Sequence, residues 1–154
     1  MTHRTPQNLR SHPTQRKNGR MTDLATLLPG EWEVRATNFP MWLTGKKLTP
    51  RFRYALLPGE PLRFDDTVVS NRPDGRETLL RGVDTLRGDS LVWRGRGLLW
   101  LFASRWRVIE VHADDLVTIE FDRTLATPSG RDVIARAGVS ADRVEAVAGG
   151  LVVL

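Results

Sequence analysis

The chain has 154 residues, of which 40% are hydrophobic and 27% are charged, so it suits one globular domain and is not disordered throughout. It has no cysteine, which excludes disulfides, thiolate metal sites and a cysteine nucleophile, and it has no apolar run long enough to span a bilayer. The net charge is +5, and segment 1–20 accounts for it, because that segment holds basic residues and no acidic ones.

Segment 1–20 is predicted to be a disordered basic tail, and residues 21–154 a single domain, because the segment has too few apolar residues to offset the entropy of ordering. Basic tails attract nucleic acid, but no aromatic residue accompanies these charges for base stacking. Three alternatives stay open: a solvated arm, an extension upstream of a start at Met21, or a nucleic-acid-binding arm. No nucleic acid is expected to bind the domain itself. The segment lacks the apolar stretch of a secretory signal, which predicts a cytoplasmic protein.

The domain begins with a helical turn, predicted over 22–28 from leucines at helical spacing and ended by a Pro-Gly pair. A strand is predicted over 31–37. A loop over 38–47 follows, and it carries several large apolar side chains, of which Trp42 is the largest.

Strand signals dominate the rest of the chain, and turn signals recur about every 8–12 residues. The segment 51–57, for example, alternates arginines with Phe52 and Tyr54, the period of a half-buried strand. Near the end, Ser140 is placed to cap a helix over Ala141–Ala148. Further strands are predicted over 62–70, 77–86, 90–95, 105–111, 116–123 and 131–136, with an apolar segment over 98–102 and a final short strand over 151–154.

This order predicts an all-β fold with a short C-terminal helix and a final strand. About eight antiparallel strands in sequence favour an up-and-down barrel, because closure removes the exposed sheet edges. A barrel of that size either holds one small ligand or is filled by its own side chains.

Two motifs resemble those of the lipocalin family of the calycin superfamily, and its bacterial members especially. Gly30-Glu31-Trp32 is similar to the Gly-x-Trp that opens the first strand in that family, and Arg136 ends the last barrel strand before the helix. The resemblance implies a barrel whose closed end is plugged by Trp32, with Arg136 lying over the indole ring. The acidic-Tyr motif of the family is missing, because residues 112–115 read His-Ala-Asp-Asp.

In such a barrel alternate residues face the cavity, and the segment 38–47 forms a mobile lid at the open end. Glu110 shares the parity of Trp106, so it is either an inward polar anchor or a solvated residue at the rim. The residues expected to contact a ligand are Trp42, Phe52, Tyr54, Phe64, Trp93, Trp106 and Glu110.

Other charged residues give weaker indications. The arginines at 94, 96, 105 and 107 either recognise a carboxylate or form a solvated outer face. Asp65 and Asp66 point to opposite faces of a strand, so as neighbours they do not form a shared-proton pair. His112 is the one histidine outside the tail, and it falls in a predicted turn. No catalytic residue, metal site or cofactor is therefore assigned.

The sequence predicts non-covalent binding of a hydrophobic small molecule or lipid in a barrel cavity, as in a carrier. The alternative is a cofactor-free cyclase or isomerase that folds an apolar biosynthetic intermediate into a reactive shape. The oligomeric state and the identity of the ligand stay open.

Overall fold

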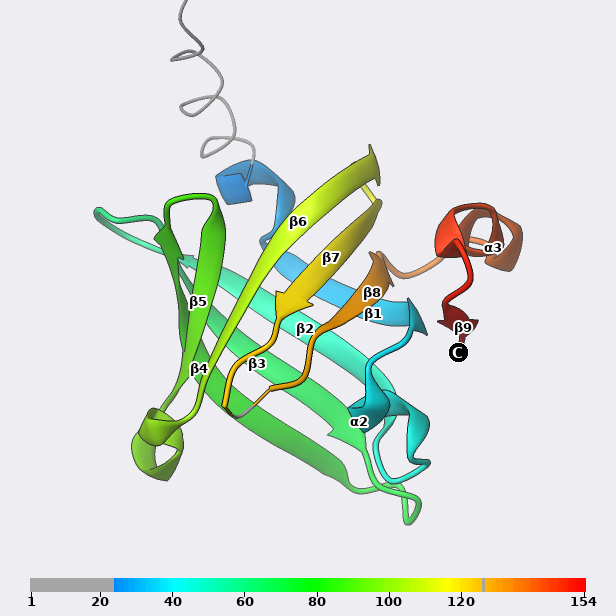
Figure 1. Cartoon of the computed structure of the whole chain (residues 1–154), viewed down its shortest axis with the longest axis horizontal. Coiled ribbons are helices and arrows are strands. Elements are labelled where there is room, and N and C mark those ends of the chain that lie inside the picture. The colour runs from blue at the N-terminus through cyan, green and yellow to red at the C-terminus, as the bar shows by residue number, and fades with distance from the viewer. Residues whose placement is uncertain (1–23, 126) are drawn as a thin grey trace, which may run out of the picture.

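The computed structural model describes residues 24–125 and 127–154, so the predicted tail over 1–20 lies outside the described residues. Within that part of the chain, nine strands form one antiparallel sheet (Figure 1). The strands are β1 (Gly30–Thr37), β2 (Leu48–Leu57), β3 (Arg63–Asn71), β4 (Glu77–Arg87), β5 (Ser90–Gly95), β6 (Ala103–Ala113), β7 (Leu116–Asp122), β8 (Gly130–Ala135) and β9 (Val152–Val153). The helices are α2 (Pro40–Leu43), the 3₁₀ helix η1 (Gly97–Leu101) and α3 (Ala141–Ala148), and residues 24–27 are also helical.

The sheet closes into a ring of eight strands, which confirms the predicted barrel. The strands β2 through β8 pair with one another in chain order. The ring closes through β1, which pairs with β8 on one side and with β2 on the other. Residues 30–33 of β1 pair with β2, whereas its residues 36 and 37 pair with β9. A bulge at Arg35 separates these two halves, so β1 changes partner along its length.

The C-terminal helix spans the predicted residues 141–148, and Ser140 stands at its N-cap without a side-chain capping bond. The apolar segment 98–102 lies largely within η1 between β5 and β6. None of the helices in residues 24–125 and 127–154 is long and apolar enough to cross a bilayer.

The contact that the lipocalin resemblance implies at the closed end is present. The guanidinium carbon of Arg136 lies 4.0 Å from the centre of the Trp32 ring, and Trp32 Nε1 donates to the Leu28 carbonyl at 2.9 Å. Arg136 also donates to the carbonyls of Leu27 and Pro29, both at 2.8 Å. A cation–π contact of this kind contributes about 0.5–2 kcal/mol.

The glycine of the motif is required for that packing. Gly30 has φ +108°, and a Cβ at this position would stand 2.6 Å from Nη1 of Arg136. Any other residue would therefore be strained and would displace the arginine from the indole ring.

Two hydrophobic cores lie on the two faces of the sheet. The inner core packs inside the barrel around Trp32, Phe64 and Trp106. The outer core packs α3 against β1 and β8 through Val133 and Val144. The barrel is therefore sealed at one end and braced on one side.

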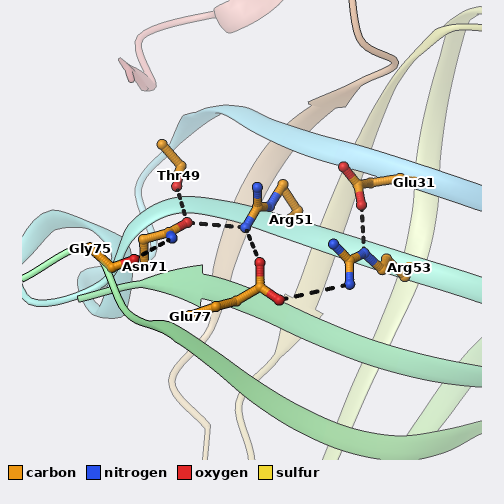
Figure 2. A network of polar contacts seen from close by, with 7 residues as sticks. All are labelled: Glu31, Thr49, Arg51, Arg53, Asn71, Gly75 and Glu77. Atoms are coloured by element: carbon orange, nitrogen blue, oxygen red, sulfur yellow. Dashed lines mark hydrogen bonds and ion pairs between the residues drawn. The ribbon is translucent and has the colours of Figure 1, made fainter.

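Outward-facing arginines make ion pairs on the barrel surface. Figure 2 shows Arg51 and Arg53 of β2 on either side of Glu77 of β4, with Arg53 also bound to Glu31 of β1. The arginines considered above as carboxylate ligands also face outward: Arg96 pairs with Asp65 at 3.0 Å, and Arg107 pairs with Glu120 at 2.6 Å. These arginines form a solvated outer face.

Candidate functional site

The barrel opens at the end opposite Trp32. Four connections gather at this mouth: α2 between β1 and β2, the turn after β3, η1 between β5 and β6, and residues 123–125 and 127–129 before β8 (Figure 1). The rim is apolar at η1, where Leu98 is 96% exposed and Trp100 is 59% exposed. An apolar rim suits the entry of an apolar ligand.

A cavity of about 430 Å³ extends inward from the mouth, so the barrel is not completely filled by its own side chains. Its walls are mostly aromatic and aliphatic. The lining residues are Phe39, Met41, Trp42, Phe52, Tyr54, Asp66, Val68, Leu80, Trp93, Leu99, Phe102, Ala103, Ser104, Trp106, Phe121, Thr127 and Pro128.

Most of the residues expected to contact a ligand lie in this lining. They are Trp42, Phe52, Tyr54, Trp93 and Trp106. Phe64 is fully buried and lies outside the lining. Glu110 also lies outside it, with its side chain 66% exposed. Of the two positions considered for Glu110, the structure shows the solvated one.

His112 belongs to β6, not to the predicted turn. Its Nε2 lies 2.8 Å from Thr118 Oγ1, and its Nδ1 lies 3.6 Å from Glu110 Oε1. The strand extends further than the sequence indicated, because the register of β6 with β7 continues to Ala113. His112 is therefore held beside β7 and away from the cavity lining.

Trp42 was expected to belong to a mobile lid over 38–47, and the structure places it in a fixed position. It lies on α2, which begins at Pro40, and only 5% of the residue is exposed. Its ring meets Phe52 edge-on at 6.4 Å, and its Nε1 donates to Asp132 Oδ2 at 3.2 Å. Trp42 is thus anchored in the barrel, where it forms part of the cavity wall.

Asp132 of β8 is a buried acid whose two oxygens are both hydrogen-bonded. Thr37 Oγ1 donates to Oδ1 at 2.5 Å, and Trp42 Nε1 donates to Oδ2. Burial raises the pKa of Asp132 to about 6, although both hydrogen bonds act to lower it. The role of this acid is to join β1, α2 and β8.

The sequence did not predict a second group of buried acids. Asp66 of β3 pairs with Gly82 of β4, and Phe64 pairs with Asp84, so the two aspartates lie diagonally on the interior face. Both are buried, and their carboxyl groups are within hydrogen-bonding reach of each other. Asp66 lines the cavity, and Asp84 lies one step nearer the closed end.

The hydrogen bonding of this pair is incomplete. Asp84 Oδ1 accepts a hydrogen bond from Trp106 Nε1 at 2.9 Å. Outside the pair itself, Asp84 Oδ2 and Asp66 Oδ1 have no hydrogen-bond partner, and Trp93 Nε1 and Ser104 Oγ of the cavity-lining residues have none either. Three of the residues that hold a polar atom without a partner, Asp66, Trp93 and Ser104, therefore line the cavity.

Burial is the main cause that raises the pKa of both acids of the pair. The charge of Asp84 and the hydrogen bond to it raise the pKa of Asp66 further, whereas hydrogen bonds from Asp66 and Trp106 limit the rise for Asp84 to about 6. Burial also raises the pKa of Tyr54 well above its usual value, and the charges of the three buried acids add to this effect. The two carboxyl groups therefore titrate as a coupled pair, in which the negative charge of Asp84 favours the protonated form of Asp66.

Sequence comparison identifies no relative: no family model matches the chain, and no curated protein matches it. Solved structures do match. Lobster apocrustacyanin A1 is 16% identical, with a TM-score of 0.62 over 90% of this chain and 76% of that one. H1 crustacyanin from the lobster Homarus americanus is 18% identical, with a TM-score of 0.59 over 90% of this chain and 76% of that one.

A siderocalin, Ex-FABP, is 16% identical, with a TM-score of 0.57 over 79% of this chain and 81% of that one. These neighbours are lipocalins of the calycin superfamily. At such low identity the likeness establishes the fold, and the chain is a lipocalin-type barrel.

Proposed function

We propose that the barrel binds a hydrophobic small molecule non-covalently, in the manner of a carrier or a sequestering protein. The observation that supports this most strongly is the cavity of about 430 Å³ with its aromatic and aliphatic lining. Burial of apolar ligand surface there contributes roughly 25 cal/mol for each Å² removed from water. The comparison with siderocalin Ex-FABP, which is described as functioning through dual ligand specificities, is consistent with this use of the fold.

The proposal is tested by titrating the full chain with N-phenylnaphthylamine, a neutral dye whose nitrogen is not basic and whose fluorescence rises in apolar surroundings. We expect saturable binding. A matched pair of variants locates the site: Leu80 lines the cavity, whereas its neighbour Leu79 is exposed on the outer face of β4. Leu80→Trp fills the cavity and should weaken dye binding about tenfold or more, which corresponds to about 1.4 kcal/mol, while Leu79→Trp should leave it unchanged.

Two outcomes would overturn the proposed function. The first is the absence of saturable dye binding to the folded protein. The second is an equal loss of binding in both tryptophan variants, which would place the dye on the outer surface of the barrel.

One observation favours a second candidate, a cofactor-free cyclase or isomerase. Burial and the charge of Asp84 raise the pKa of Asp66 at the cavity wall, and a buried carboxylic acid of this kind can act as a general acid. Recovery distinguishes the two candidates: a carried ligand is released unchanged, whereas a substrate is converted and the conversion stops in Asp66→Asn. The cytoplasmic location and a lipid as ligand stay predictions from the sequence.

A further inference from the structure

The acid pair at the cavity wall has no basic counterpart. No Lys, Arg or His occurs among the residues that line the cavity within the described chain. The titratable groups around the pair are Tyr54 from β2, Asp65 next along β3 and Asp132 from β8, and none of them is basic. A buried charge is ordinarily paired, because an unpaired one carries a large desolvation cost.

The carboxyl pair also has acceptor oxygens that no other group of the protein uses. Asp66 lines the cavity, and its buried Oδ1 has no hydrogen-bond partner outside the pair. Asp84 lies next to Asp66 on the side of the closed end, and its Oδ1 accepts a hydrogen bond from Trp106 Nε1 at 2.9 Å. The contact with a ligand therefore falls to Asp66, and Asp84 acts as a positioning residue.

The walls next to Asp66 are aromatic faces. Tyr54 stacks on Trp106 with 5.7 Å between ring centres. Trp93 lies directly on Gly82, the partner of Asp66 across the sheet, where a Cβ would stand 2.3 Å from the indole ring. The absence of a side chain at Gly82 is what lets the indole lie there. Aromatic rings attract cations, most strongly where water is excluded.

We propose that the Asp66–Asp84 pair is the recognition point for a basic nitrogen, so that the cavity selects hydrophobic amines over alcohols and carboxylic acids with the same apolar body. The inference rests on the proposed binding function and names its ligand class. The ammonium group donates to the carboxyl group of Asp66 and neutralises the buried charge. A carboxylate would instead place a second negative charge beside the first.

The test is competition against N-phenylnaphthylamine with three probes of one apolar body: phenylbutylamine, phenylbutanol and phenylbutanoate. At neutral pH we expect the amine to bind about tenfold more tightly than the alcohol or more, with the acid weakest. Asp66→Asn should remove that preference by weakening amine binding and leave alcohol binding within about twofold. Asp65→Asn is the matched control, because Asp65 faces outward and pairs with Arg96 at 3.0 Å.

A second readout uses the unaltered protein. Lowering the pH below about 6 protonates both carboxyls, so the preference for the amine over the alcohol should decrease as the negative charge is lost. This readout does not depend on whether Asp66→Asn folds.

The possible failures are distinguishable. Equal affinity for the three probes, or an amine preference that survives in Asp66→Asn and at acidic pH, would overturn the inference and leave the binding function standing. If neither the dye nor any probe binds the folded protein, both the binding function and the inference are wrong.

Discussion

Asp132 and the Asp66–Asp84 pair are buried acids in one barrel, and they differ in how their oxygens are satisfied. Both oxygens of Asp132 accept hydrogen bonds, from Thr37 and Trp42. One oxygen on each member of the pair accepts none. Burial raises the pKa at both sites, so the pKa direction does not separate them.

This contrast distinguishes a structural acid from a pair of candidate binding acids. A buried acid with saturated hydrogen bonds stabilises the elements that it joins. A buried acid with vacant acceptors reduces stability, and such a cost is typical of sites that bind or react. Five expected outcomes test this contrast, beginning with the largest effect.

Trp42→Ala should reduce the free energy of unfolding by about 3–5 kcal/mol, because it removes a buried ring and one donor to Asp132. Denaturant unfolding measures the change. Trp100→Ala is the control, since Trp100 is 59% exposed on η1 and should lose far less. A loss in Trp42→Ala as small as that of the control would restore the mobile lid that the sequence suggested.

Asp132→Ala should reduce the free energy of unfolding by about 2–4 kcal/mol, since Thr37 Oγ1 and Trp42 Nε1 both lose their acceptor. The same denaturant unfolding at neutral pH measures this. If stability were unchanged or increased, Asp132 would not be the structural acid of the comparison.

Asp84→Asn should increase stability, whereas Asp132→Ala reduces it. At alkaline pH we expect Asp84→Asn to raise the free energy of unfolding by an amount on the order of 2 kcal/mol. The amide still accepts from Trp106 Nε1 through its oxygen and donates to Asp66 through its nitrogen. No buried charge is then left unpaired at position 84.

The pH profile of the unaltered protein follows from the same shift. A pKa raised in the folded state gives stability that is fully present below the unfolded pKa of about 4 and is lost as the pH rises through about 6. Asp84→Asn should flatten this decline when unfolding is followed across the range. A profile that rises with pH over this interval would contradict the raised pKa values.

Asp65→Asn should change the free energy of unfolding by less than about 1 kcal/mol, because its ion pair with Arg96 is exposed and screened by salt. Thermal unfolding with and without added salt checks this. A larger loss would mean that the outer face of β3 supports the fold as strongly as its interior does.

The sequence predicted those features that depend on local pattern. Gly30, Trp32 and Arg136 occupy the positions that the family motifs implied, and the alternation in β2 placed Phe52 and Tyr54 inside. These predictions succeed because strand periodicity fixes the face on which a side chain lies.

The acid pair was not predicted, because it depends on the register between β3 and β4 and not on neighbours in sequence. A signal was nevertheless present: Asp66 shares the parity of Phe64 and Val68, so an acid stands on the apolar face of its strand. The burial of Trp42 was also unpredictable, since it depends on Asp132, which lies 90 positions away in the chain.

The most direct test of the contrast is the NMR spectrum of the aspartate carboxyl carbons during titration with phenylbutylamine at neutral pH, with signals assigned through the Asn variants. We predict that the signals of Asp66 and Asp84 shift as the amine binds, while that of Asp132 stays in place. Saturation by the amine with no response from the pair, or a response from Asp132 alone, would contradict the assignment of Asp66 and Asp84 as the binding acids.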